Sequence, residues 1–411
     1  MPDAHRPDAA RTAIRLLVVI GSFNRGGCER HLLRVLPVLD PDCIEVEVFV
    51  LDKRGPLANV IESCGVPVHA PWIKGGGSRN PLFRGARIAV VSFQLWMYLI
   101  KRRPQITHYF LPASYLIGVP VAIMAGVKRR VLSRRSLDHY QRARPWLAAI
   151  ERAFHRTTTA FIGNSRTVVQ QLVEKERVPA ERATVIYNGV PIPELVTEQR
   201  EEIRAIHALG SNTLVMVIVA NLIPYKGHVD LLRACARARD KLPVDWVLLI
   251  IGRDDGIGDE LVHLVKELGL SNQVRFLGER DDVESVLAVC DIGLLVSYQE
   301  GFSNAILECM AAGLPMVVTD VGGNAEAVAD GETGRVVPLG DEAGLADALA
   351  ELAGDADLRR AMGCAGRQRV LNLFGLDRCV EDYTRFYQAV AADHFVGDFA
   401  DVEFRDHEFL D

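Results

Sequence analysis

Short, mostly apolar runs recur along the chain, and each is followed by a turn and then by a helical pattern. Runs of this kind predict strands that are buried on both faces of a parallel sheet. In the first half they lie at 14–20, 46–51, 130–133, 159–165 and 183–189, and in the second half at 214–220, 246–252, 274–278, 292–297 and 315–320. Amphipathic patterns such as 228–242 and 261–270 fill the gaps. The sequence therefore predicts two successive sets of β–α repeats.

The periodicity is interrupted at 187–195, where YNGVPIPEL carries an Asn-Gly pair and two prolines. We therefore predict an α/β protein made of two Rossmann-like, doubly wound domains that face each other across a cleft. The predicted parts are a disordered segment at 1–13, a first domain at 14–190, a second domain at 191–375, a helix at 376–394 and an acidic tail at 395–411. In such sheets ligands bind outside the carboxyl ends of the strands.

Composition is that of an ordinary globular protein, with 411 residues of which 49% are hydrophobic and 24% charged. The eight cysteines form no Cys-x-x-Cys pair, which suits a reducing cytoplasm. The polar start of the chain does not have the pattern of a signal peptide. The apolar run at 88–100 is too short to span a bilayer, and 104–127, with its three prolines, predicts a strand followed by a buried helix.

The net charge of −6 conceals an uneven distribution. Between Lys74 and Arg156 the chain has 16 lysines and arginines and only 2 acidic residues, so this segment is +14. Such a segment predicts an anionic partner, and the alternative interpretation is a set of solvated arginine faces on helices. Because the charges lie among apolar aromatic stretches, we favour an anionic partner, such as phosphates or a lipid surface, over solvated arginine faces. No nucleic-acid partner is expected.

The stretch EGFSNAILE, at 300–308, follows a predicted strand and opens a predicted helix. Ser303 or Asn304 can cap that helix, and its first backbone N–H groups would then be able to bind a phosphate. Glu300 precedes the cap, and Glu308 lies more than a turn inside the helix. Both carboxylates suit sugar hydroxyls better than phosphate, because a carboxylate accepts two hydrogen bonds from a vicinal diol. On spacing alone, Glu308 is equally explained as a residue on a solvated helix face.

Two other strand ends carry candidate phosphate-binding residues. Lys226 follows the strand in VANLIPYKGHVDLLRA and can neutralise a diphosphate as a point charge. Gly26 and Gly27, in IGSFNRGGCERH, let the backbone approach an anion closely. Taken singly, the first is more often a solvated lysine and the second an ordinary β–α turn. The glycine spacing differs from GxGxxG, so a nicotinamide-dependent oxidoreductase gains little support.

In this order and context, the motifs resemble a known family. The chain resembles the retaining, nucleotide-sugar-dependent glycosyltransferases of the GT-B fold called family 4, or glycosyl transferases group 1. The resemblance covers about residues 14–392. It rests on FNRGGCER, FIGNSRTVVQQL and ATVIYNGV in the first half, and on VANLIPYKGH, VRFLGERDDVESVLAVCDIGLLVSYQEGFSNAILECMAAGLPMVVTDVGGNAEAV and GETGRVV in the second. The second half is much the more specific.

The resemblance implies a role for each matching residue. Glu308 would hold the donor ribose, and Glu300 would lie beside the donor sugar at the reacting carbon. Lys226 would stabilise the departing diphosphate, and Gly26 and Gly27 would close over it. Further donor contacts would come from the backbone of Phe302, Ser303 and Asn304, and from Phe276 or Leu277 near the base. The helix at 376–390 would cross back onto the first domain.

Two departures from the family pattern concern positive charge and a histidine. The family usually has an arginine where Asn221 stands, so the second positive charge on the diphosphate must come from elsewhere, with Arg253, Arg134 and Arg135 as candidates. Many members also have a histidine after the strand that here reads RVLSRRSLDHY. This stretch offers Arg134, Arg135 and, further on, His139. We expect an arginine on a phosphate rather than His139 as a base.

The implied activity is retaining transfer of a sugar from a nucleotide-diphosphate sugar. A UDP-sugar is the expected donor, and no metal is expected, because Asp355-Ala356-Asp357 is predicted to start a helix. An inverting enzyme would need a general base, for which His108, Asp138 and His139 are the first-domain candidates.

Taken together with the family resemblance, the +14 segment implies a polyprenyl-diphosphate-linked or polysaccharide acceptor in bacterial cell-surface glycan synthesis. The expected location is the cytoplasm, peripheral on the inner face of the plasma membrane. The alternatives are a nucleotide-sugar epimerase of the GT-B fold and a non-catalytic nucleotide-sugar-binding protein.

Overall fold

The computed structural model describes residues 13–73, 80–142, 144–194 and 200–394. The predicted acidic tail, and the predicted N-terminal segment except for residue 13, lie outside the described residues. The chain divides into two compact units. Unit 1 holds the residues up to Asn164, Val168–Ile186 and the residues from Cys379 on, and unit 2 holds Ser165–Thr167 and Tyr187–Arg378.

Unit 1 contains a seven-stranded sheet in the order β3-β2-β1-β4-β5-β6-β7, with every neighbouring pair parallel. The strands run outward from β1 in both directions, so the switch point lies between β1 and β4. The strands are β1 (Ile14–Ile20), β2 (Ile44–Val50), β3 (Val68–His69), β4 (Ile106–Phe110), β5 (Arg129–Arg134), β6 (Ala160–Gly163) and β7 (Ala183–Val185).

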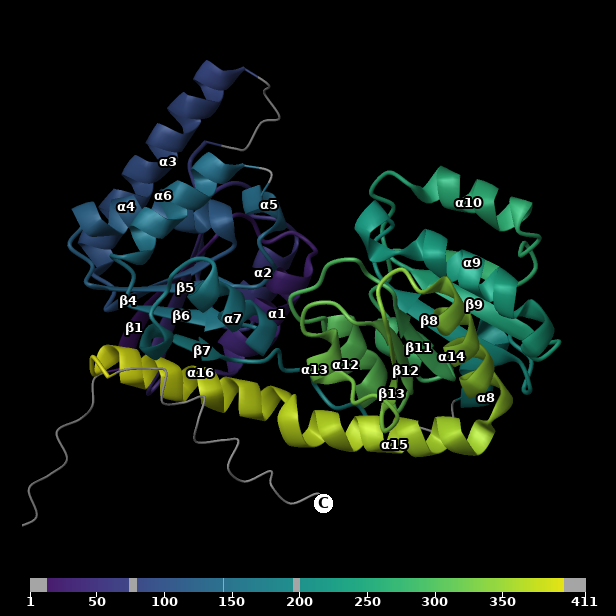
Figure 1. The fold of residues 1–411 in the computed structure, drawn as a ribbon. Coiled ribbons are helices and arrows are strands. Elements are labelled where there is room, and N and C mark those ends of the chain that lie inside the picture. Colours follow the sequence, from purple (N-terminus) through teal and green to yellow (C-terminus); the bar gives the residue numbers. More distant parts are fainter. Residues whose placement is uncertain (1–12, 74–79, 143, 195–199, 395–411) are drawn as a thin grey trace, which may run out of the picture. The chain divides into compact units, whose positions relative to one another are not determined.

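The helices of unit 1 connect its parallel strands. Since such crossovers are right-handed and the strands extend in both directions from β1, helices cover both faces of the sheet. Three of them, α3, α4 and α6, pack together as one layer (Figure 1). The helices are α1 (Gly27–Val35), α2 (Leu57–Ser63), α3 (Pro81–Arg102), α4 (Pro112–Met124), α5 (His139–Arg142), α6 (Pro145–His155), α7 (Arg166–Glu174) and α16 (Leu376–Ala391); 3-10 helices lie at Leu36–Val38 and Ala180–Arg182. Strand residues such as Leu17, Val19 and Leu132 form the buried core.

Helix α16 joins the core of unit 1 through two tyrosines. The Tyr383 hydroxyl lies 3.1 Å from His31 Nε2, and the Tyr387 hydroxyl lies 2.8 Å from His108 Nδ1. All four side chains are buried. These hydrogen bonds satisfy polar groups that would be costly to bury unpaired, so they fix the register of α16 on this unit.

Unit 2 contains a six-stranded parallel sheet in the order β10-β9-β8-β11-β12-β13. Its switch point lies between β8 and β11. The strands are β8 (Leu214–Val219), β9 (Trp246–Ile251), β10 (Val274–Gly278), β11 (Ile292–Leu295), β12 (Met316–Thr319) and β13 (Gly334–Val337). Met216, Val217 and Ile218 are fully buried, as expected of a strand covered by helices on both faces.

The helices of unit 2 alternate with its strands. They are α8 (Arg200–Ile206), α9 (His228–Ala238), α10 (Gly258–Glu267), α11 (Val283–Leu287), α12 (Asn304–Ala311), α13 (Asn324–Ala327), α14 (Glu342–Gly354) and α15 (Ala356–Leu373); 3-10 helices lie at Pro224–Lys226 and Arg239–Lys241. Asp355 is the N-cap of α15, and its carboxylate accepts a hydrogen bond from the Leu358 N–H at 2.9 Å. The predicted helix start at 355–357 is therefore confirmed.

The predicted fold class is confirmed, because both units are doubly wound α/β structures with parallel sheets. Each predicted strand is present with its ends shifted by a few residues at most, and 104–127 forms a strand and a buried helix, β4 and α4. Strands β3 and β13 were not predicted; β3 has only two residues, which give no periodicity. Among the described helices, none is long and apolar enough to cross a membrane.

Candidate functional site

Two predicted residues meet at the switch point of unit 2, where the carboxyl ends of β8 and β11 adjoin. Lys226 ends the 3-10 helix that follows β8, and Glu300 lies in the loop after β11. Lys226 Nζ forms an ion pair with Glu300 Oε1, and the two side chains are 18% and 11% exposed. Burial and the charge of Lys226 lower the pKa of His228 to about 4, so His228 is neutral at pH 7 and Lys226 carries the positive charge of this turn.

The loops after β8 and β11 are joined through their backbones. The Tyr298 N–H donates to the Tyr225 carbonyl at 2.7 Å. Gly227 has a φ of +73°, and a Cβ on it would lie 1.9 Å from the Val296 carbonyl oxygen. Only glycine allows both this conformation and this approach. The sequence Lys-Gly therefore positions Lys226 against the Glu300 loop.

Glu300 is held by residues that sequence reasoning did not single out. The Ser297 hydroxyl donates to Glu300 Oε1 at 2.8 Å, and the Thr319 hydroxyl donates to the Ser297 carbonyl at 2.6 Å. Gly322 has a φ of +56°, and a Cβ on it would lie 1.9 Å from the Glu300 carbonyl oxygen. Thr319 and Gly322 both belong to the sequence motif TDVGG. The motif alone does not show that they contact the Glu300 loop, because that contact depends on the order of the strands. Loops after three adjacent strands thus fix one carboxylate.

Helix α12 presents the remaining predicted donor contacts of this loop. Ser303 is its N-cap by backbone position, although its side chain makes no capping hydrogen bond. Asn304 Oδ1 instead accepts from Asn188 Nδ2 at 2.7 Å. Within the part of the chain that the structure describes, the loop N–H groups of Phe302 and Ser303 have no hydrogen-bond acceptor. Glu308 is partly exposed one turn beyond Asn304, on the same face of the helix.

Phe302 has a side chain with a structural role. Its ring packs against Tyr187 and Phe374 at centroid distances of 5.0 and 5.3 Å, and it is 4% exposed. The buried ring leaves only the backbone of Phe302 available to a ligand, and the predicted donor contact stays a prediction. Phe276 and Leu277 are half-buried on the edge strand β10 and pack against the core of unit 2.

Asn221 stands in a polar cluster at the carboxyl ends of β8 and β9. Its Nδ2 donates to Asp255 Oδ2 at 3.0 Å, and its Oδ1 accepts from the Arg253 N–H at 3.3 Å. The Arg253 guanidinium binds the same carboxylate at 2.7 and 3.0 Å, and this side chain is 46% exposed. Of the three arginines predicted to supply a second cation, Arg253 is therefore the one beside Asn221, with its charge balanced by Asp255.

Gly26 and Gly27 lie at the start of α1, which follows β1 at the carboxyl edge of the unit 1 sheet. A Cβ on Gly26 would lie 2.4 Å from the Glu29 carboxylate, whereas no atom lies within 4 Å of a Cβ on Gly27. Arg135 directly follows β5 at the same edge. Burial raises the pKa of Glu29, and the nearby Arg135 opposes this shift. Glu29, which sequence reasoning missed, therefore shares this edge with three predicted residues.

Arg134 was predicted as a candidate phosphate contact, but its side chain is buried, unlike that of Arg135, and is already paired. Its side chain is 3% exposed and pairs with Glu151 and Glu176 at 3.0 and 2.5 Å. Consecutive strand residues point to opposite faces of a sheet, which explains why Arg134 is buried while Arg135 is not. Arg135 stays a candidate. His139 begins α5, but its side chain lies outside what the structure describes.

Many family members have a histidine in the first domain, and the buried His108 does not take its place. Its ring nitrogens lie 2.8 Å from the Ser133 and Tyr387 hydroxyls, and burial together with Arg135 holds its pKa well below the usual range. With no exposed surface, His108 cannot reach an acceptor as a base. The Asp138 side chain is 12% exposed and forms an ion pair with Arg142 at 3.1 Å.

The buried pair gives a stability prediction. Arg134→Met leaves Glu151 and Glu176 without their cation, and we expect a loss of about 3–5 kcal/mol in the free energy of unfolding. Burial alone would raise the pKa of Glu176, but Arg134, His155 and Gln141 outweigh it and lower the pKa to about 2. This stabilisation is present above the ordinary pKa of 4.5 and is lost as the pH falls toward 2. Urea unfolding should therefore show a smaller difference at pH 4 than at pH 7.

The matched control for this prediction is Arg142→Met. Arg142 also pairs with a carboxylate, but its side chain is 63% exposed, so its loss should cost less than about 1 kcal/mol. Equal costs for the two substitutions would contradict the buried network.

Two family models match the chain. The model for Glycosyltransferase Family 4 matches residues 25–193, and the model for Glycosyl transferases group 1 matches residues 199–369. Together they cover both units. The chain belongs to the family 4 glycosyltransferases. The prediction of a glycosyltransferase is thereby confirmed.

Several named proteins are similar to this chain. It is 30% identical to N-acetyl-alpha-D-glucosaminyl L-malate synthase of Bacillus anthracis, over 52% of this chain and 56% of that protein. The chain therefore matches only about half the length of that relative. It is 28% identical to D-inositol 3-phosphate glycosyltransferase of Salinispora tropica, over 91% of this chain and 83% of that one.

Solved structures agree with the fold. Anabaena Alr3699/HepE in complex with UDP-glucose covers 92% of this chain with all of its own, at a TM-score of 0.79 and 21% identity. Sucrose-phosphate synthase from Thermosynechococcus elongatus covers 92% with 99% of its own, at a TM-score of 0.76 and 20% identity. At such identities the likeness shows the GT-B fold alone.

Proposed function

We propose that the carboxyl edge of the unit 2 sheet binds a nucleotide-diphosphate sugar and transfers its sugar with retention. The ion pair between Lys226 and Glu300 carries this proposal. It places a cation and a carboxylate at a switch point, beside loop N–H groups that lead into α12. A diphosphate needs the cation and the N–H donors, and a sugar needs the carboxylate.

The chemistry follows from the charges that develop during transfer. As the bond between the anomeric carbon and the diphosphate oxygen breaks, the sugar carbon becomes positive and the diphosphate more negative. Lys226 and the N–H groups of Phe302 and Ser303 stabilise the diphosphate. Glu300 stabilises the sugar. The acceptor oxygen attacks on the same face, and its proton passes to the leaving diphosphate, so the reaction needs neither a first-domain base nor a metal.

The donor is proposed to be a UDP-sugar. The support is the structure of Anabaena Alr3699/HepE in complex with UDP-glucose, whose fold this chain shares. In this arrangement Glu308 holds the ribose, and Phe276 or Leu277 contacts the base. Arg253 supplies the positive charge that other family members have from an arginine at the position of Asn221.

Donor binding tests this proposal directly. Calorimetry with UDP-, GDP- and ADP-sugars should find one class that binds, and Glu308→Ala should weaken its affinity about 10- to 100-fold by removing the ribose contact. Glu267→Ala is the control, since Glu267 is a 60% exposed glutamate on α10. If no nucleotide sugar binds, or if both substitutions act alike, the donor site is refuted. An epimerase would instead interconvert the donor without an acceptor.

The acceptor is proposed to be lipid-linked, with the enzyme peripheral on an anionic membrane. The support is an exposed apolar surface on the first turns of α3, where Leu82, Phe83 and Ile88 are 82%, 48% and 46% exposed. Arg84 is exposed among them, and Lys101 and Arg102 end the helix. Apolar side chains beside basic ones favour insertion into an anionic lipid surface.

Vesicle sedimentation tests the membrane proposal. The enzyme should bind phosphatidylglycerol vesicles more tightly than phosphatidylcholine vesicles, and added salt should weaken binding. Leu82→Ser/Phe83→Ser should reduce binding about tenfold or more. The control is Val244→Ser/Leu339→Ser, which removes two exposed apolar side chains from unit 2. Equal binding by both double variants would contradict a role for α3.

A further inference from the structure

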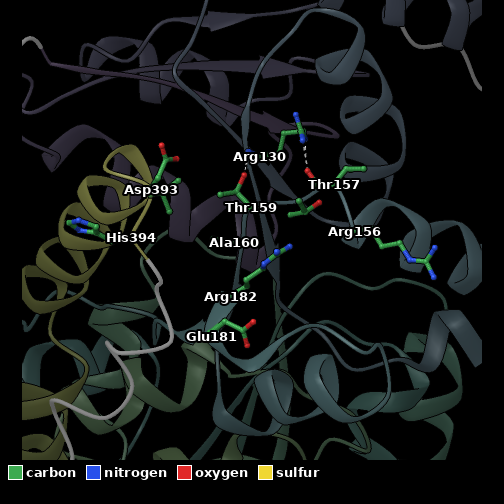
Figure 2. A pocket seen from close by; sticks show the side chains of 11 residues that line it. Arg130, Arg156, Thr157, Thr159, Ala160, Glu181, Arg182, Asp393 and His394 are labelled. Carbon is green, nitrogen blue, oxygen red and sulfur yellow. Dashed lines mark hydrogen bonds between the residues drawn. The ribbon is translucent and has the colours of Figure 1, made fainter.

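Unit 1 contains a cavity that the glycosyl transfer does not use. It has a volume of about 340 Å³ and lies at the amino ends of β5, β6 and β7, the edge of the sheet opposite to Gly26, Gly27 and Arg135. Figure 2 shows its lining side chains, which come from these strand starts, from the segment between α6 and β6, and from the end of α16 and the residues after it. A space of this size suits a small metabolite.

The register of the sheet assembles the cavity. Val131 pairs with Ala160, and Phe161 pairs with Ala183, so the residues before them line up along one edge. Arg130 and Thr159 are therefore neighbours, and Arg182 lies beside the start of β6. The Thr159 N–H donates to the Arg130 carbonyl at 2.8 Å, and the Arg130 N–H donates to the Thr159 hydroxyl at 3.1 Å. The floor of the cavity is thus fixed by backbone pairing.

Arg130 is part of this fixed frame. Its Nε donates to the Thr157 carbonyl at 2.8 Å, and its other guanidinium nitrogens bind the carbonyls of Val127 and Thr157. These neutral acceptors leave its positive charge uncompensated. Burial lowers the pKa of Arg130, but an arginine stays protonated at pH 7.

Two further arginines line the cavity without partners. Among the described residues, neither the Arg156 nor the Arg182 side chain has a hydrogen bond or ion pair, and the same holds for the His394 ring. Glu181 also lines the cavity, but it is exposed and pairs with neither arginine. The structure therefore collects donors from three separate segments around one space.

The other carboxylate of the cavity is already neutralised. Asp393 accepts two hydrogen bonds from Arg129, at 2.9 and 2.8 Å. These hydrogen bonds are the main reason why the pKa of Asp393 is lowered. The Asp393 carboxylate is therefore occupied by Arg129 and does not balance the charge of Arg182. With Arg129 included, four arginines face two carboxylates, so the cavity has an excess of positive charge.

We propose that this cavity binds a phosphate-bearing small anion. A guanidinium can donate two parallel hydrogen bonds to a phosphate, and the uncompensated charges of Arg130, Arg156 and Arg182 favour an anion that carries more than one negative charge. The site lies wholly within unit 1 and shares no residue with the proposed donor site.

Hydrogen–deuterium exchange with inorganic pyrophosphate tests the site at constant ionic strength. Pyrophosphate should slow exchange in peptides covering 155–160 and 180–184. In Arg156→Gln/Arg182→Gln, the dissociation constant read from this protection should rise about tenfold or more. Arg152→Gln is the matched control, because Arg152 is an exposed arginine of α6 outside the cavity. Arg182→Glu alone should abolish the protection while leaving the unfolding midpoint unchanged.

Unchanged exchange in both peptides would overturn the inference, as would equal protection in the double variant or equal protection by malonate. Protection confined to 223–230 and 297–306 would also overturn it, because it reports binding at the proposed donor site only. The two proposals therefore fail separately.

Discussion

Lys226→Ala is expected to lower kcat for sugar transfer at least about 100-fold. The lysine faces the bond that breaks, and removing one preorganised charge from such a position typically costs two to three orders of magnitude. Its charge matters more in the transition state than in the donor complex, so kcat should fall more than the donor affinity. Steady-state kinetics with the nucleotide sugar identified by calorimetry measures both.

Lys241→Ala is the control for this experiment. Lys241 also ends a 3-10 helix of unit 2 and also pairs with one carboxylate, Asp347 at 2.7 Å, but its side chain is 63% exposed. It should retain the activity of the parent enzyme. A Lys226→Ala enzyme with near-normal kcat would refute the proposal that Lys226 stabilises the departing diphosphate. A change in KM alone would assign Lys226 to ground-state binding.

Sequence patterns were sufficient for the fold because the strands are nearly all buried. Residues 214–219 and 246–251 are continuous aliphatic runs that fit a covered parallel strand, and their ends were predicted within one residue. The order of the strands is not visible in such runs. It determines which loops adjoin, and it therefore decides that Lys226 and Glu300, 74 residues apart, form an ion pair.

The candidate site was predictable where a residue acts through its position after a strand. Lys226, Glu300 and Asn221 all lie at carboxyl ends of unit 2 strands. The prediction for Arg134 was wrong because the sequence does not show to which face of the sheet a strand residue points. Arg134 and Arg135 are adjacent and equally basic, yet only Arg134 meets two buried carboxylates.

Residues that support the site were missed for a related reason. Ser297 and Thr319 are common polar residues in strand-end loops, and their hydrogen bonds to the Glu300 loop exist only because β11 and β12 are neighbours. The cavity at the amino ends of β5, β6 and β7 could not be predicted from the sequence either, because it also depends on which strands are neighbours. Arg130, Arg156 and Arg182 are scattered over about 50 residues of the sequence, and only the sheet brings them together.

Gly322→Ala is expected to reduce both stability and activity, although Gly322 has no reactive group. Its φ of +56° disfavours any residue with a Cβ, and that Cβ would lie 1.9 Å from the Glu300 carbonyl oxygen. The backbone of one loop must move, so we expect a loss of about 1–3 kcal/mol in the free energy of unfolding. Since Glu300 moves with its carbonyl, kcat should fall about tenfold or more through misplacement of the carboxylate.

The control is Gly354→Ala, at the end of α14, where no atom lies within 4 Å of the added Cβ. It should leave kcat unchanged. Urea unfolding and steady-state kinetics on both variants separate two cases. A Gly322→Ala enzyme that loses stability but keeps its kcat would show that the Glu300 loop can shift without harm, and the carboxylate would then lie outside the reacting centre. A parallel loss of both would tie the position of Glu300 to the loop after β12.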